Sequence, residues 1–141
     1  MYNGEHMKLK DVLRQYDEQS LYFYARDLGI QATKDILPEQ LCQTMVERIL
    51  NDHHIEKRLS ILDDQTYQVF LQVLSDEEIE EKDNLFLERL LDYDLIAFEG
   101  NELFVVEEVK EIFHNVQNEL SFQQERLQKM LIFILFYKIF L

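Results

Sequence analysis

The sequence predicts a mainly helical fold with one short β-hairpin. Along most of the chain, apolar residues recur every three or four positions, which places them on one face of a helix. The 141 residues include only 3 Gly and 1 Pro, whereas an all-β fold needs turn residues at short intervals. The exception lies at 95–106, where two short apolar runs flank Gly100 and Asn101, a pair suited to a tight hairpin turn.

The chain is long enough for a substantial core. Apolar residues make up 47% of it, including 10 Phe and 7 Tyr. A chain of this length buries about 70% of the surface that its unfolded state exposes. A boundary is predicted near residues 60–64, which gives a helical unit at 1–62, an acidic unit at 63–120 and an apolar C-terminal helix at 121–141. We expect the first two units to pack together.

Several residues in the first unit are suited to helix ends. A short amphipathic helix is expected near residue 9, and Asp17 or Ser20 can cap a second helix. Gly29 then suits the left-handed conformation that ends many helices. After a connector, Pro38 favours the first turn of a third helix, and His53 marks its end.

The second unit is expected to contain helices on both sides of the hairpin. Helical spacing continues to Leu74. Ser75 is expected to cap a short acidic helix over 76–81, because carboxylates favour a helix N-terminus. Another helix contains Leu87, and the hairpin and a further helix follow. A separate last helix is expected over 122–139.

The net charge of −14 is concentrated in the middle of the chain. Residues 61–120 carry 17 Asp and Glu against 3 Lys and Arg, whereas residues 1–60 carry 10 against 8. Such a region repels phosphate polymers, because nucleic-acid affinity comes mainly from cations that displace counterions. A basic protein partner would be attracted instead. The residues expected to form this acidic binding face are Glu77, Glu78, Glu80, Glu81, Glu88, Asp92 and Asp94.

Residues 8–50 resemble the helix–extended loop–helix of SAP-type and Rho N-terminal-type domains. The matching structural positions are Leu21, Ala25, Leu28, Gly29, Ile30, Leu41, Val46, Ile49 and Leu50. Those families usually bind nucleic acid, so the resemblance implies a second hypothesis, in which the contacts are made by Lys8, Lys10, Arg14, Arg26 and Lys34. The chain departs from the families at Leu37–Glu39, where they tend to carry Gly and a cation.

Residues 64–113 resemble a winged helix whose wing is the hairpin. DNA-binding members place their third helix in the major groove with basic and amide side chains. Here the corresponding helix region carries Glu88, Arg89, Asp92 and Asp94, and the wing carries Glu99 and Glu102. The resemblance therefore implies a protein-binding version of the fold. The order of the two units also resembles the N-terminal part of uncharacterised bacterial proteins that end in a zinc-binding SEC-C motif, which this chain lacks.

No pattern in the sequence predicts catalysis, a cofactor or a metal site. The four histidines do not form an HExxH motif, and there is no CxxC, GxSxG or Gly-rich phosphate loop. The only cysteine, Cys42, lies on an apolar helix face, where a packed thiol is expected. A single cysteine also excludes an internal disulfide and favours a reducing, cytoplasmic location. No signal peptide is recognisable at residues 1–6.

The C-terminal segment is strongly apolar. Residues 130–141 contain one charge, Lys138. As a helix these residues would extend about 18 Å, short of the roughly 30 Å of a bilayer core. We therefore expect a buried helix rather than a membrane span, with Leu131–Leu141 pairing in a homodimer or with sequence outside this chain.

The two hypotheses for function differ in the charge that they use. The first is a non-catalytic protein-interaction or regulatory module with an acidic face for a basic partner. The second is a nucleic-acid-binding regulator that acts through the first unit. A nucleic-acid-mimicking inhibitor would use the same carboxylates as the first hypothesis, and no sequence feature separates those two.

Overall fold

The fold is mainly helical with a single hairpin in the described residues, which confirms the predicted class. This computed structural model describes residues 7–140, apart from the side chains of 119–123, 137, 139 and 140. The elements are α1 (Leu9–Arg14), α2 (Glu18–Asp27), α3 (Pro38–Asn51), α4 (His54–Ser60), α5 (Asp64–Leu74), a short 3₁₀ helix η1 (Glu81–Asp83), α6 (Asn84–Asp92), β1 (Ile96–Glu99), β2 (Glu102–Val105) and α7 (Glu107–Phe140).

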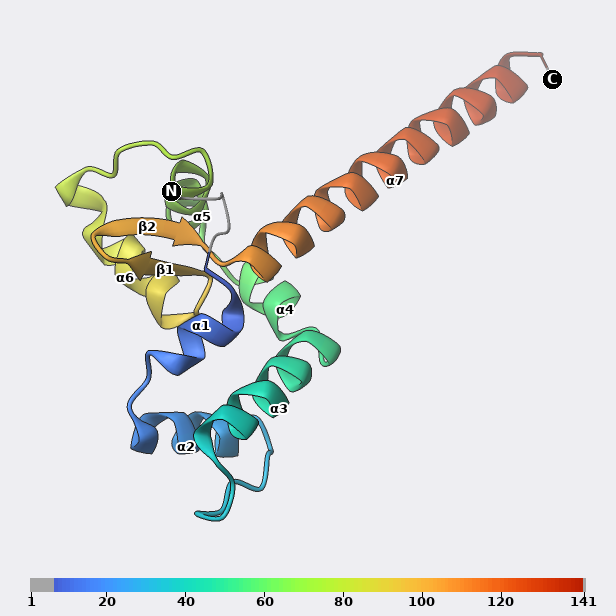
Figure 1. The fold of residues 1–141 in the computed structure, drawn as a ribbon. Helices are drawn as coiled ribbons and strands as arrows, with labels where there is room; N and C mark the ends of the chain where they lie inside the picture. Colours follow the sequence, from blue (N-terminus) through green and yellow to red (C-terminus); the bar gives the residue numbers. More distant parts are fainter. Residues whose placement is uncertain (1–6, 141) are drawn as a thin grey trace, which may run out of the picture.

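Within the body of the molecule, the hairpin lies at the end opposite α2 and α3 (Figure 1). Its strands are antiparallel, and their register pairs Ile96 with Val105 and Glu99 with Glu102. Gly100 has a φ of 62° in the turn, and Asn101 has no positive φ, as in a type II′ turn. The predicted hairpin at 95–106 is therefore confirmed.

Helix ends follow local chemistry that the sequence displays. The Asp17 carboxylate accepts a hydrogen bond from the Ser20 amide at 2.8 Å, and Pro38 occupies the first turn of α3. Gly29 (φ 80°) ends α2 in a Schellman motif, in which the amide of Ile30 donates to the carbonyl of Ala25 at 3.0 Å.

The expected helix over 76–81 is wrong. Ser75 is instead the C-cap residue of α5, and Asp76 takes a left-handed conformation (φ 58°). The Glu77 amide donates to the carbonyl of Gln72 at 2.9 Å, which completes a second Schellman motif. Residues 77–80 then have no regular secondary structure, and Glu81–Asp83 form a helical turn. Carboxylates three and four positions apart would repel one another on a helix at 77–81.

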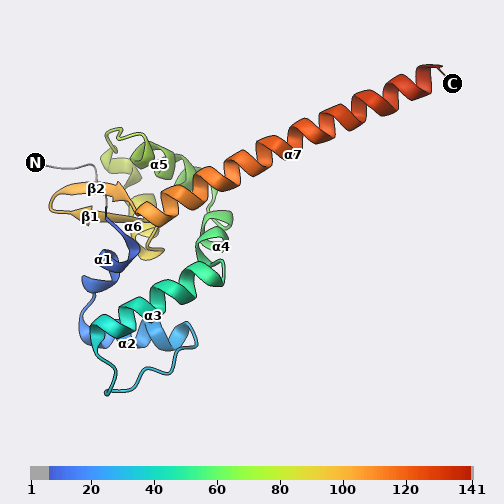
Figure 2. The same ribbon diagram turned by 45° about the vertical axis from the view of Figure 1, so that its right-hand side comes forward.

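The expected break between two C-terminal helices is also wrong. Helix α7 runs without interruption from Glu107 to Phe140, because this stretch contains neither Gly nor Pro. Figures 1 and 2 show its distal part leaving the body of the molecule. Within this chain no other described element buries the apolar segment, because residues 130–136 are 46–69% exposed.

Two apolar clusters stabilise the body. The larger cluster joins both halves of the chain, since Leu9 and Ile55 pack with Phe70, Leu90 and Val109. The smaller cluster lies within the first half and contains Leu13, Leu21, Leu41, Cys42 and Met45 among others. The shared larger cluster fixes the hairpin and α6 relative to α1 and α4.

The N-terminal segment is attached to the second half by backbone and side-chain bonds. The Glu107 amide donates to the carbonyl of Met7 at 3.0 Å, and the Leu9 amide donates to Glu108 Oε1 at 2.9 Å. Gln15 Nε2 donates to the carbonyl of Phe98 on β1 at 3.4 Å. These bonds hold α1 beside β1 and the start of α7.

Candidate functional site

A groove of about 600 Å³ lies between the hairpin and the segment that links α5 to α6. The volume is within the range of sites that bind small molecules or short peptide segments. Its lining combines apolar side chains with carboxylates and comprises Val73, Leu74, Asp76, Glu77, Ile79, Asn84, Leu87, Phe98, Asn101, Glu102, Leu103, Phe104, Val105 and Lys110.

The apolar part of the groove belongs to the edge of the larger core cluster. Val73 and Leu74 come from the last turn of α5, and Leu87 comes from α6. Leu103 and Val105 come from β2 and pack on the same cluster. An apolar partner side chain that packs on these residues would be removed from water. Its burial would stabilise the complex by about 25 cal/mol for each Å² of apolar surface.

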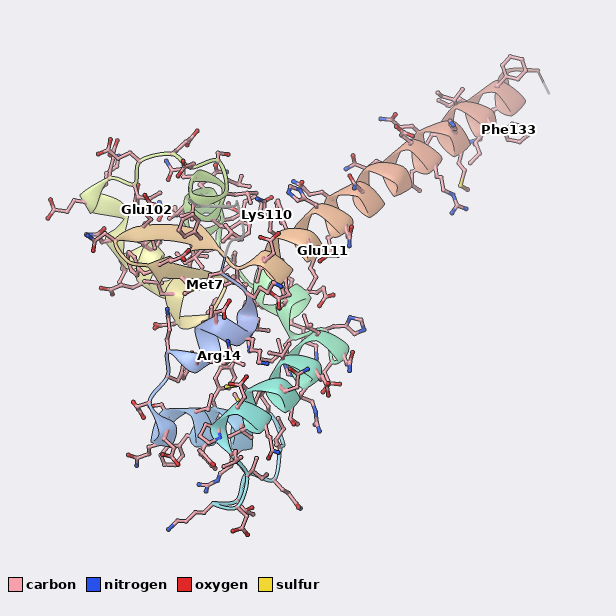
Figure 3. All side chains as sticks on the ribbon, in the orientation of Figure 1. Met7, Arg14, Glu102, Lys110, Glu111 and Phe133 are labelled. Atoms are coloured by element: carbon pink, nitrogen blue, oxygen red, sulfur yellow. The ribbon has the colours of Figure 1, made fainter. Side chains whose placement is uncertain are left out.

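Carboxylates outnumber cations along the groove. Asp76, Glu77 and Glu102 are exposed lining residues, and Lys110 is the one Lys or Arg among the lining residues. Figure 3 shows Glu102 on the hairpin and Lys110 on the first turns of α7, beyond the other end of β2. The groove is therefore acidic at the hairpin turn and along the linking segment.

Local structure explains why these carboxylates face the groove. The left-handed Asp76 ends α5 and turns the chain, so that Glu77 and Ile79 line the groove together with the hairpin. The type II′ turn at Gly100 returns the chain into β2, which begins with Glu102. Both features depend on single residues with positive φ, of which Gly and Asp are among the more tolerant types.

Most of the carboxylates expected on an acidic face are exposed, but they do not form one patch. Glu77 lines the groove, and Glu78, Glu80 and Glu81 are exposed on the same linking segment. Glu80 is also within 3.1 Å of the Lys82 ammonium group. Two further exposed carboxylates, Glu88 and Asp92, lie on α6 outside the groove lining.

Asp94 was expected on the acidic face, and this expectation is wrong. Its side chain is only 5% exposed. It has a left-handed backbone (φ 56°) at the end of α6, where the Leu95 amide donates to the carbonyl of Leu90 at 3.2 Å in a third Schellman motif. This conformation turns the chain from α6 into β1 and directs the carboxylate inward.

The Asp94 carboxylate belongs to a polar junction between the two halves of the chain. The Tyr16 hydroxyl donates to it, with oxygen–oxygen distances of 2.7 and 3.0 Å. Nearby, Arg58 donates to the Tyr24 hydroxyl at 2.6 Å and to the carbonyl of Tyr93 at 3.2 Å. A second hollow of about 410 Å³ opens beside this junction.

Burial makes the groups of this junction reluctant to ionise. It raises the pKa of Asp94 above the usual value, although the Tyr16 hydroxyl and the Arg58 charge lower it. Burial also raises the pKa of Tyr16 and raises the pKa of Tyr24 to about 12. The junction therefore fits a role in joining the two halves better than a role on a charged surface.

The cations of the nucleic-acid hypothesis are spread over the first unit, and two of them are paired. Glu39 is 3.0 Å from the Lys10 ammonium group and accepts from Arg14 Nε at 3.1 Å. The Arg14 hydrogen bond, followed by that of Lys10, lowers the pKa of Glu39 to about 2. Arg26 lies over the Phe23 ring, 5.8 Å from its centre.

The remaining two cations, Lys8 and Lys34, are exposed on separate segments.

The three consecutive aromatic residues of α2 have three different environments. The Tyr22 hydroxyl donates to the carbonyl of Ile36, Phe23 is 54% exposed, and Tyr24 lies under Arg58.

Sequence reasoning missed the pairing of Tyr16 with Asp94 and the role of Arg58. The partners are 78 residues apart in the first pair, and no local pattern links such distant positions. The groove itself had a partial signal, because Glu77 was predicted on the acidic face and Glu102 on the wing of the hairpin. Their separation in the sequence hid the fact that they line one hollow.

Within the described residues, no group of three or more His, Cys, Asp or Glu side chains is arranged to hold a metal ion. The Cys42 side chain is 2% exposed, and burial raises the pKa of its thiol. Among residues 7–140, no helix combines the length and the apolar character that crossing a bilayer requires.

Comparisons with protein-family models, with curated proteins and with solved structures gave no match to this chain.

Proposed function

We propose that this protein is a non-catalytic protein-interaction or regulatory module that binds a basic segment of another protein in the groove beside the hairpin. The observation that supports this proposal best is the combination of a packed apolar floor with exposed carboxylates at Asp76, Glu77 and Glu102. The floor would supply affinity by apolar burial. The carboxylates would select a cationic partner and raise its association rate.

The charge of the surrounding region favours the same partner. Residues 61–120 carry 17 Asp and Glu against 3 Lys and Arg, and one of those cations, Arg89, already donates to Asp63 at 2.6 Å. A field of this sign attracts cationic segments from beyond contact distance and repels phosphate polymers. A nucleic-acid-mimicking inhibitor would be a special case, in which the basic partner also binds DNA or RNA.

The order of elements supports a winged-helix-like assignment as part of this proposal. Helix α5, the turn η1, helix α6, the hairpin and the first turns of α7 follow one another in the order that this fold requires. In the proposed version, the acidic wing and linking segment contact protein rather than DNA.

The alternative proposal, a nucleic-acid-binding regulator acting through the first unit, has less support. Two of its five cations, Lys10 and Arg14, share the carboxylate of Glu39. Cations that are already paired release fewer counterions on binding a phosphate backbone.

Helix α7 supports a second part of the proposal, self-association through the C-terminal helix. Residues 130–136 are seven consecutive exposed apolar residues, and Leu127 is 58% exposed one turn earlier. Seven consecutive positions cover every face of an α-helix, and a helix that is apolar all round is normally buried. We propose that other copies of this helix bury it, in a cytoplasmic protein whose single thiol is reduced.

Peptide binding tests the groove proposal directly. The probe is a fluorescent, end-capped hexapeptide of alternating lysine and valine, compared with a hexapeptide of alternating glutamate and valine. We expect the lysine peptide to bind with an affinity that falls as salt is added, and the glutamate peptide to bind at least tenfold more weakly. Equal binding of the two peptides, or no binding of either, would contradict the proposal.

A matched pair of variants separates the groove from the total charge. Glu77→Gln with Glu102→Gln removes two charges from the groove, and we expect it to weaken the lysine peptide several-fold. Glu18→Gln with Glu47→Gln removes two exposed charges from α2 and α3 and is expected to change the affinity by less than a factor of about two, because charges beyond a Debye length of roughly 8 Å are screened.

A further inference from the structure

Among residues 7–140, the outer edge of β2 has backbone groups without backbone hydrogen-bond partners. Alternate residues of an antiparallel strand point their N–H and C=O groups toward the neighbouring strand and away from it. The Val106 amide donates to the carbonyl of Leu95 at 3.1 Å, and the register pairs Ile96 with Val105. Val106 therefore points toward β1, whereas the backbone groups of Leu103 and Val105 point away from it.

The edge of β1 shows the same alternation from the other side. Phe98 is paired with Leu103, so its backbone must also point outward. Its carbonyl does accept a hydrogen bond from outside the sheet, from Gln15 Nε2 at 3.4 Å. The side chain of Gln15, directly after α1, thus occupies part of the edge of β1. Within residues 7–140, no backbone hydrogen bond covers Leu103 or Val105 on the edge of β2.

The groove lies along this uncovered edge. Every residue of β2 lines it, and the linking segment, with Asp76, Glu77 and Ile79, forms the opposite wall. Residues 77–80 have no regular secondary structure and make no strand pairing with β2. The space between them is about 600 Å³. An exposed strand edge is a template for another strand, and many domains bind extended peptides in this way.

We propose that the basic segment binds as a third strand on β2, hydrogen-bonded to the outward backbone groups of Leu103 and Val105. This inference rests on the proposed function, because the acidic edges of the groove determine the chemistry of the occupant. Side chains of neighbouring strands share faces. The segment would therefore place apolar side chains on the core face, beside Leu103 and Val105, and cationic side chains on the opposite face, beside Glu102.

Amide hydrogen exchange, followed by NMR with the lysine–valine hexapeptide, tests the strand addition. In the protein alone, the amides of Leu103 and Val105 should exchange quickly. Saturating peptide should slow both by at least tenfold, whereas the Phe104 amide, which faces β1, should change much less. Slow exchange of Leu103 and Val105 before peptide is added would overturn the proposal, because the edge would already be covered by another part of this chain or by a second copy.

Backbone methylation of the peptide provides the matched control. One analogue carries N-methyl groups on its valines, and the other carries them on its lysines. An added strand presents every second N–H to β2, so one analogue should bind at least tenfold more weakly than the other. If the peptide adds antiparallel to β2, the analogue methylated on valine should be the weaker one. If it adds parallel, the analogue methylated on lysine should be the weaker one. Equal affinities of the two analogues would overturn strand addition.

The result also separates the two proposals. Binding that depends on charge but leaves the exchange of Leu103 and Val105 unchanged would overturn the strand addition alone. Failure of the unmethylated lysine peptide to bind would overturn the function proposed for the groove.

Discussion

At the scale of single residues, Asp94 differs from the other carboxylates of its region because it is buried. Its carboxylate accepts two contacts from the Tyr16 hydroxyl, and burial raises its pKa. A raised pKa in the folded state means that folding favours the protonated acid. This residue therefore stabilises the fold most at low pH, and its contribution decreases as the pH rises from the usual value of 3.8 through the folded pKa.

The direction of this pKa shift gives a prediction for Asp94→Asn. Asparagine accepts the same hydrogen bond from Tyr16, tolerates the left-handed conformation and carries no charge to bury. At pH 7 we expect the variant to be at least as stable as the native protein. The difference in the free energy of unfolding should shrink toward zero below pH 3.8, as measured by urea unfolding at several pH values.

Asp94→Ala is the control for this prediction. Alanine leaves the Tyr16 hydroxyl without its acceptor and is strained at a φ of 56°. We expect a loss of about 1–3 kcal/mol at pH 7. An alanine variant as stable as the asparagine variant would contradict the assigned role of this junction.

At the scale of elements, the hairpin depends on Gly100. Its φ is 62°, and a Cβ built there meets no atom within 4 Å. The cost of a side chain at this position is therefore conformational rather than steric. We expect Gly100→Ala to destabilise the protein by about 1–2 kcal/mol in urea unfolding.

Asn101→Ala is the control, because Asn101 lies in the same turn but has no positive φ. We expect this variant to change the free energy of unfolding by less than about 0.5 kcal/mol. Similar losses for the two alanine variants would show that the turn does not require the conformation assigned to Gly100.

The elements that local chemistry defines could be predicted from the sequence. Asp17 can cap a helix, Pro38 has a φ suited to a first turn, and Gly29 and Gly100 accept positive φ. The structure places each at the expected helix end or turn. Ser75 misled because serine suits a helix N-terminus in general, whereas here α5 already occupies the residues before it. The left-handed conformation of Asp76 ends α5, and no helix begins at this residue.

The candidate site was less predictable than the elements. Its acidic character followed from composition, but the groove exists only because residues 76–79 and β2 lie opposite each other after folding. The environment of Asp94 depends on Tyr16, between α1 and α2, and on Arg58 of α4. Contacts of this kind have no periodic signal in a single sequence.

At the scale of the whole molecule, α7 extends an apolar surface away from an acidic body (Figure 2). Exposed apolar patches of this size mark interaction sites. We expect the protein to self-associate with increasing concentration in analytical ultracentrifugation. Ile132→Glu with Leu135→Glu should shift the distribution toward monomer, because buried unpaired carboxylates are strongly unfavourable.

The matched control adds the same charge to exposed polar positions of the same helix, as Gln124→Glu with Gln128→Glu. We expect this control to associate nearly as the native protein does. A native protein that stays monomeric at all concentrations would contradict self-association through α7.

The central claim is that the acidic groove beside the hairpin binds basic protein segments. The most direct measurement is an NMR titration of the isotope-labelled protein with the lysine–valine hexapeptide, which shows where the peptide binds. We predict that the amide signals that move most belong to residues 73–79 and 101–105, and that the shifts decrease as salt is added. Shifts confined to α1–α3, or equal shifts with the glutamate–valine peptide, would contradict the claim.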